Sequence, residues 1–87
     1  MIEDLLVFTK TISDPTRLKI LHYLKRECCV GELWEKMELP QNLVSHHLKV
    51  LREAGLINSD KKGLKVIYRL NEPTLVKNLN QLNIYLK

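Results

Sequence analysis

Residues 41–57, QNLVSHHLKVLREAGLI, combine a helical apolar stripe with a polar face of uncommon composition. If Val44, Leu48 and Leu51 point into a core, the outward side chains carry amide, hydroxyl, imidazole and basic groups. These side chains are Gln41, Asn42, Ser45, His46, Lys49 and Arg52. Amides can donate to and accept from adenine at once, whereas Lys and Arg suit guanine or phosphate. The face therefore predicts hydrogen bonding to the base edges of DNA, although a plain solvated face is the alternative for an isolated helix.

A second group that could do chemistry is the adjacent pair Cys28 and Cys29. We favour a structural reading, in which small residues start a helix and one of them is buried. Two alternatives stay open: a thiophilic metal or arsenite effector, and a redox sensor, because thiols near a helix N-terminus can oxidise readily. Arsenite prefers three thiolates and zinc usually takes four ligands. The pair is thus a candidate thiol effector site, and we predict no metal site and no cofactor.

The two neighbouring histidines are assigned to different surfaces. His46 falls on the polar face with the candidate DNA contacts, whereas His47 falls at the edge of the apolar stripe. Adjacent residues of a helix point in different directions, so the two rings cannot converge on one metal ion.

The elements needed to position these groups follow from periodicity and punctuation. A helix at 2–12 is followed by Ser13 or Asp14 as a cap and by Pro15 in the first turn of a helix running to about Arg26. A short helix is expected at 30–37, followed by the polar helix at 40–54 with Gly55 as its stop. Two β runs follow at 56–59 and 65–70 around a DKKG tip. A last helix runs from 72 or 73 to 86. The predicted fold is mainly α with a small β-hairpin, in the order of a winged helix-turn-helix. The hairpin would bring basic side chains to the DNA backbone or minor groove, namely Lys61, Lys62, Lys65 and Arg69.

Length and charge agree with one small nucleic-acid-binding domain. The chain has 87 residues, and residues 41–87 carry eight Lys/Arg against three Asp/Glu, while residues 1–40 carry six against seven. No apolar run approaches the roughly 20 residues of a membrane span, and the start MIEDLL is acidic, unlike a signal peptide, so a cytoplasmic location is expected. No Gly-rich phosphate loop or catalytic carboxylate pair is present, so we predict no enzyme activity. The alternative function is a winged-helix protein–protein interaction module without DNA binding.

The stretches SDPTRLKILHYL, CVGEL, QNLVSHHLKVLREAGLI and KGLKVIYRL closely resemble the ArsR/SmtB family of winged-helix repressors, from about Ile12 to Leu70. The resemblance implies a homodimer that binds an inverted-repeat operator near its own promoter and releases it when an effector binds. It also implies dimerisation through the terminal helices 2–12 and 73–86. The apolar residues expected at that interface, which one small domain could not fully bury, are Leu5, Phe8, Leu75, Leu79, Leu82 and Leu86.

The metal sites known in that family are both incomplete in this sequence. Where the family has a stretch like ELCVCEL, this chain has ECCVGEL, so Cys29 matches the first ligand and Gly31 stands at the second. The last-helix site needs paired Asp/His and His/Glu, but residues 71–87 contain no His and no Asp. Leu43 also occupies a position where the family often has Thr or Ser. The sequence therefore predicts an effector other than a classical metal, or none.

Overall fold

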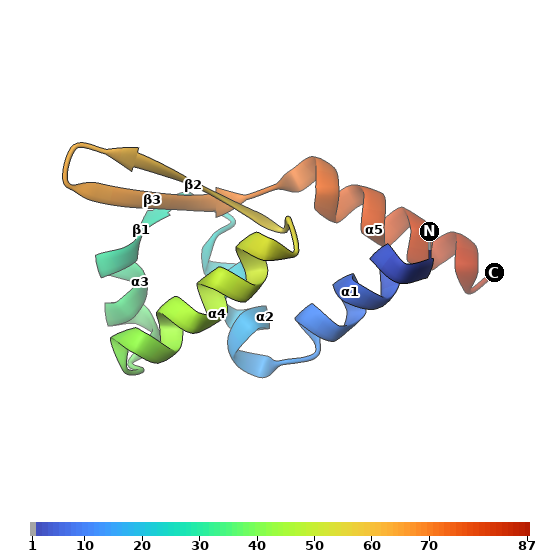
Figure 1. Cartoon of the computed structure of the whole chain (residues 1–87), viewed down its shortest axis with the longest axis horizontal. Coiled ribbons are helices and arrows are strands. Elements are labelled where there is room, and N and C mark those ends of the chain that lie inside the picture. The colour runs from blue at the N-terminus through green and yellow to red at the C-terminus, as the bar shows by residue number, and fades with distance from the viewer. Residues whose placement is uncertain (1) are drawn as a thin grey trace.

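The computed structural model describes residues 2–87, which form five helices and a three-stranded antiparallel sheet. The elements are α1 (Ile2–Ile12), α2 (Pro15–Tyr23), β1 (Cys28–Cys29), α3 (Val30–Met37), α4 (Gln41–Glu53), β2 (Ile57–Lys62), β3 (Lys65–Leu70) and α5 (Glu72–Tyr85). The molecule is elongated, about 44 × 23 × 18 Å. Helices α1 and α5 lie side by side at one end and the β2–β3 hairpin extends to the other (Figure 1). The predicted winged helix-turn-helix order is confirmed.

The core lies between α2, α3, α4 and the base of the hairpin. In α4, the spacing of Val44, Leu48 and Leu51 places all three on one face, and all three are buried, as predicted. The other fully buried large side chains are Ile20, Leu24, Leu33, Leu56 and Ile57. Because α4 is anchored by one apolar face, its opposite face is left to solvent along its whole length.

Helix α2 begins as predicted but ends earlier. Asp14 caps it, because its Oδ1 accepts from the Arg17 backbone N–H at 3.0 Å, and Pro15 occupies the first turn. The expected end near Arg26 is wrong: the helix ends at Tyr23, since Leu24 has left helical geometry with ψ 8°. Leu18 of this helix is exposed, whereas Ile20 is fully buried. The early end allows the chain to turn into β1.

The sheet differs from the predicted hairpin in two ways. Strand β2 continues through Lys62, so the loop is Gly63–Leu64, with Lys62 opposite Lys65, and the predicted strand 56–59 with a DKKG tip is too short. Gly63 has φ +63°, which suits a two-residue hairpin loop. The second difference is β1, in which Cys28 pairs with Tyr68 of β3. A two-residue strand has no periodicity of its own, and only its pairing with β3 defines it.

The terminal helices bury more within one chain than the sequence suggested. Leu5 and Phe8 are only 7% and 3% exposed, because α1 packs along α5 and onto the core. The expectation that a single domain leaves these two unburied is therefore wrong. Leu75 and Leu82 are half-buried, whereas Leu79 and Leu86 are 53% and 73% exposed. The other exposed apolar side chains of these helices are Ile2, Leu6, Val7, Val76, Ile84 and Tyr85.

Candidate nucleic-acid interface

The polar face of α4 is fully available to a ligand. We call its six side chains the recognition face, and every one of them is exposed: Gln41, Asn42, Ser45, His46, Lys49 and Arg52. Their neighbours Val44, His47, Leu48 and Leu51 are buried on the other side of the helix. The sequence assigned His46 outward and His47 to the core edge, and the structure places them in this way. Four of the six side chains belong to the first two turns, so the hydrogen-bonding groups concentrate at the start of α4.

The turn before α4 leaves its N-terminus open. Helix α3 ends at Met37, its C-cap Glu38 reverses the chain with a φ of +53°, and Pro40 then occupies the N-cap of α4. A proline side chain cannot accept a hydrogen bond, and among the described residues no side chain caps this helix. The first backbone N–H groups of α4 therefore have no side-chain acceptor, and an uncapped helix N-terminus can bind phosphate oxygens.

The hairpin carries the second group of basic side chains, which we call the basic wing: Lys61, Lys62, Lys65 and Arg69. All four are exposed, but they are not equivalent. Arg69 forms a hydrogen-bonded ion pair with Asp60 on the neighbouring strand. The hydrogen bond from Arg69 and its positive charge lower the pKa of Asp60, and Asp60 raises the pKa of Arg69. Among residues 2–87, the three lysines make no ion pair, so they are the wing cations free for phosphate.

A contact that sequence reasoning missed joins the start of α2 to the buried side of α4. The guanidinium of Arg17 lies 3.3 Å from Nδ1 of His47, measured from Nη1, and its Nε donates to the Thr11 carbonyl at 2.6 Å. The signal in the sequence was His47 itself, since a ring at the edge of an apolar stripe needs a polar partner. Its partner comes from a residue 30 positions away, which no local pattern reveals.

The cysteine pair forms β1, which pairs with β3 of the hairpin and precedes the first turn of α3. Cys28 is buried, and burial raises the pKa of its thiol, with the nearby Glu32 carboxylate adding to that rise. The Sγ atom of Cys29 lies 3.3 Å from Glu32 Oε1. In the described part of the chain, no cluster of three or more His, Cys, Asp or Glu side chains could hold a metal ion. Because its pKa is raised, the buried Cys28 thiol is protonated at neutral pH.

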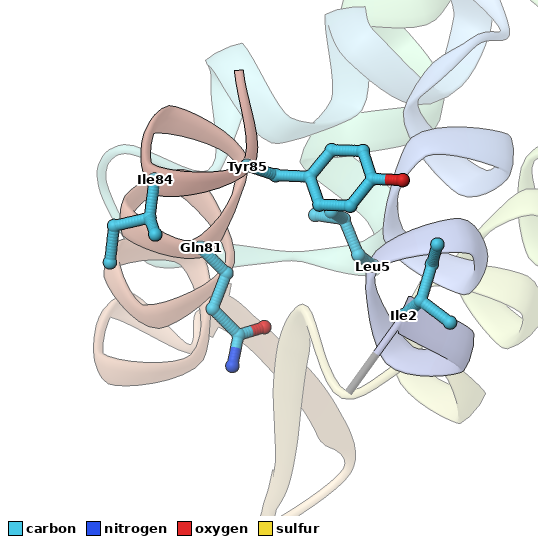
Figure 2. Close-up of a pocket in the computed structure, with 5 residues that line it drawn as sticks. All are labelled: Ile2, Leu5, Gln81, Ile84 and Tyr85. Carbon is cyan, nitrogen blue, oxygen red and sulfur yellow. The ribbon is translucent and has the colours of Figure 1, made fainter. Parts of the chain in front are cut away.

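A cavity of about 310 Å³ lies between α1 and α5, far from the recognition face. It is lined by Ile2, Leu5, Gln81, Ile84 and Tyr85, and the Tyr85 ring reaches from α5 towards α1 (Figure 2). Its walls are almost wholly apolar, and it belongs to the same end of the molecule as the exposed apolar side chains of the terminal helices.

An exposed polar helix behind a tight turn, flanked by a basic β-hairpin, defines the class of winged helix-turn-helix DNA-binding proteins. Residues 14–59 match the family described as bacterial regulatory protein, arsR family. The chain belongs to this ArsR/SmtB family of transcriptional regulators.

Individual relatives agree with this assignment. The chain is 39% identical over 72 residues to the transcriptional repressor SdpR of Bacillus subtilis (strain 168), covering 82% of this chain and 80% of that protein. It is 38% identical over 74 residues to the arsenical resistance operon repressor of Staphylococcus xylosus, covering 84% and 71%. The solved structure of an ArsR-like transcriptional regulator from Rhodococcus sp. RHA1 superposes with a TM-score of 0.87 at 26% identity, covering 95% of this chain and 79% of that one.

The family and these relatives identify a DNA-binding transcriptional regulator, and they confirm that the chain is not an enzyme. Among residues 2–87, no helix is both long and apolar enough to cross a bilayer.

Proposed function

We propose that this protein is a homodimeric repressor that reads an inverted-repeat operator by placing α4 of each subunit in a major groove. The observation that carries the proposal is the orientation of α4. Its apolar stripe Val44, Leu48 and Leu51 is buried, Leu43 is 40% exposed, and all six members of the recognition face are exposed. The residues concentrated at the start of this helix are those that contact base edges in helix-turn-helix proteins.

The exposed side chains divide into two roles by their chemistry. Gln41, Asn42, Ser45 and His46 can hydrogen-bond to base edges, whereas Lys49 and Arg52 lie further along α4 and suit guanine or phosphate. The free lysines of the basic wing would contact the backbone beside the same recognition helix. Phosphate contacts of this kind fix the register of the protein on the duplex and make binding dependent on salt.

The terminal helices supply the surface for dimerisation in this proposal. Exposed apolar side chains lie on both α5 and α1, and three of them, Ile2, Ile84 and Tyr85, also line the cavity between these helices (Figure 2). Burying such a patch against a second copy removes it from water. Two-fold symmetry would then place the two α4 helices in grooves roughly 34 Å apart, one turn of DNA, which accounts for an inverted-repeat operator.

The proposal assigns a structural role to Cys28. A protonated thiol within a sheet, with a carboxylate beside it, is a weak nucleophile and a weak metal ligand. The effector, if the protein uses one, would then act elsewhere. A double Cys28→Ser/Cys29→Ser variant should bind the operator like the wild type, and arsenite, zinc or a mild oxidant should not release the wild-type protein. Release by any of these reagents that the double variant abolishes would overturn the structural role.

A direct test of the function is a footprint of the purified protein on the DNA upstream of its own coding sequence. We expect protection of two half-sites one helical turn apart, with affinity that falls steeply as salt rises. A folded dimer that protects no DNA at any salt concentration would contradict the proposal. That result would favour the protein–protein interaction module.

A further inference from the structure

Arg17 connects two helices to which it does not belong. It is in the first turn of α2, but its Nε donates to the carbonyl of Thr11 at 2.6 Å, in the last turn of α1. The last carbonyls of a helix have no partner within the helix, so this bond satisfies one of them. From the same guanidinium, Nη1 reaches His47 on the buried side of α4. One side chain thus joins the end of a terminal helix to the recognition helix.

The contact with His47 requires a neutral imidazole. Arginine only donates hydrogen bonds, so Nδ1 of His47 must be a bare acceptor at 3.3 Å from Nη1. The ring proton is then on Nε2. His47 is only 8% exposed, so water cannot readily replace Arg17 as its partner. Protonation of Nδ1 would set two donors and two positive charges against each other.

The charged groups around His47 are few. Asp14, at the N-cap of α2, interacts electrostatically with both Arg17 and His47. On α4 itself, the ring of His46 lies against the ring of His47 with centroids 5.5 Å apart. Within residues 2–87, α3 and β2, which also pack against α4, contribute no hydrogen bond or ion pair to the His47 ring. Arg17 is therefore its only hydrogen-bond partner in the described chain, and the Asp14 carboxylate interacts electrostatically with both side chains.

We propose that Arg17 is a positioning residue for DNA binding: through a neutral His47 it holds the recognition helix against the end of α1, and protonation of His47 releases this hold and weakens operator binding. The inference rests on the proposed function. The joined elements carry the two parts of that function, since α1 belongs to the apolar end proposed for dimerisation and α4 carries the recognition face. A shift of α4 relative to that end changes the spacing of the two recognition helices in the dimer.

The sign of the pH dependence distinguishes protonation of the buried His47 from protonation of the exposed His46. His46 is exposed on the recognition face, so its protonation adds a positive charge near phosphate and strengthens DNA binding. Protonation of His47 breaks an internal contact and weakens it. A fall in operator affinity on acidification therefore points to the buried ring.

The test uses the full-length dimer and the wild type with three variants, titrated against operator DNA at about pH 7.5 and about pH 5.5 at one salt concentration. In His47→Asn, the amide Oδ1 takes the place of Nδ1 as acceptor for Arg17 but does not titrate. His46→Asn is the matched control on the neighbouring exposed residue. Arg17→Lys keeps the charge but cannot span Thr11 and His47 at once. Thermal unfolding followed by circular dichroism shows at each pH whether every variant is folded.

We expect the wild-type affinity to fall about tenfold on acidification, the size of losing one hydrogen bond to a charged group. His46→Asn should keep or enlarge this fall, and His47→Asn should abolish it. Arg17→Lys should bind about tenfold more weakly at pH 7.5 while remaining folded. A fall that persists in His47→Asn, or full affinity in folded Arg17→Lys, would overturn the proposal.

A second readout does not depend on DNA. Histidine-selective ¹⁵N NMR at pH 7.5 should show His47 neutral with its proton on Nε2, and a protonated Nδ1 would overturn the inference. Should the wild type bind no DNA at pH 7.5, the proposed function fails, and the tautomer of His47 still reports whether the Arg17 contact exists.

Discussion

At the scale of single residues, the ion pair of Arg69 with Asp60 makes Arg69 different from the three lysines of the basic wing. The sequence placed Arg69 among four equivalent cations, but its register across β2 and β3 brings it to a carboxylate. The pairing could not be predicted, because it depends on β2 continuing to Lys62. The charge of Arg69 is thus partly neutralised before any DNA arrives.

Replacing Asp60 by Asn should therefore strengthen DNA binding. The change removes a negative charge from the wing and frees Arg69 for phosphate, so we expect affinity for operator and random DNA to rise together, by about threefold, with a steeper salt dependence. Fluorescence anisotropy titrations at two salt concentrations measure both effects. Asp4→Asn, the same change at the other end of the molecule, is the control. Unchanged binding by Asp60→Asn would show that the wing does not approach the DNA.

The cap of α2 makes a prediction about acid stability. The Asp14 carboxylate accepts from the Arg17 backbone N–H, and this bond lowers its pKa. A carboxyl whose pKa is lower in the folded state stabilises the protein above its unfolded value, about 3.9, and this contribution is lost as pH falls through the folded value. Asn also caps helices, so Asp14→Asn should match the wild type near pH 7 and lose less stability below about pH 4. Urea unfolding across pH measures the difference, and parallel curves would contradict it.

At the scale of elements, the hairpin should act through charge alone. Lys62 is exposed at the end of β2 and has no ion-pair partner among residues 2–87, so Lys62→Ala should weaken binding to operator and random DNA about equally, and lower the salt slope by about one. Lys77→Ala, the same change on α5, is the matched control and should leave both unchanged. If Lys62→Ala instead altered the preference for operator over random DNA, the wing would be reading sequence.

The elements also show which parts of the fold the sequence patterns could predict. Helix α4 was predictable almost to the residue, because Val44, Leu48 and Leu51 fix its buried face and Pro40 and Gly55 mark its ends. All ten candidate DNA contacts are exposed as that reading required. Strand β1 and the Arg17–His47 contact were not predictable, since both exist only when segments distant in sequence meet. The burial of Leu5 and Phe8 was missed for the same reason.

At the scale of the whole molecule, the proposed function requires a dimer built on the terminal helices. Leu79 is 53% exposed on α5 among other apolar side chains, so Leu79→Asp should place a charge in the interface and give a monomer. Sedimentation velocity gives the mass directly. Leu64→Asp, the same change on the fully exposed leucine of the wing loop, should remain dimeric. A dimer in Leu79→Asp would move the interface to another face.

A competition titration measures whether the recognition face of α4 reads base sequence. Labelled operator DNA bound to the wild type, or to a Gln41→Ala/Ser45→Ala variant, is competed with unlabelled operator and with random DNA of the same length. We expect the variant to lose discrimination between the two competitors by at least about tenfold, while its affinity for random DNA stays close to wild type. Undiminished discrimination in the folded variant would show that the exposed face of α4 is not the surface that reads the operator.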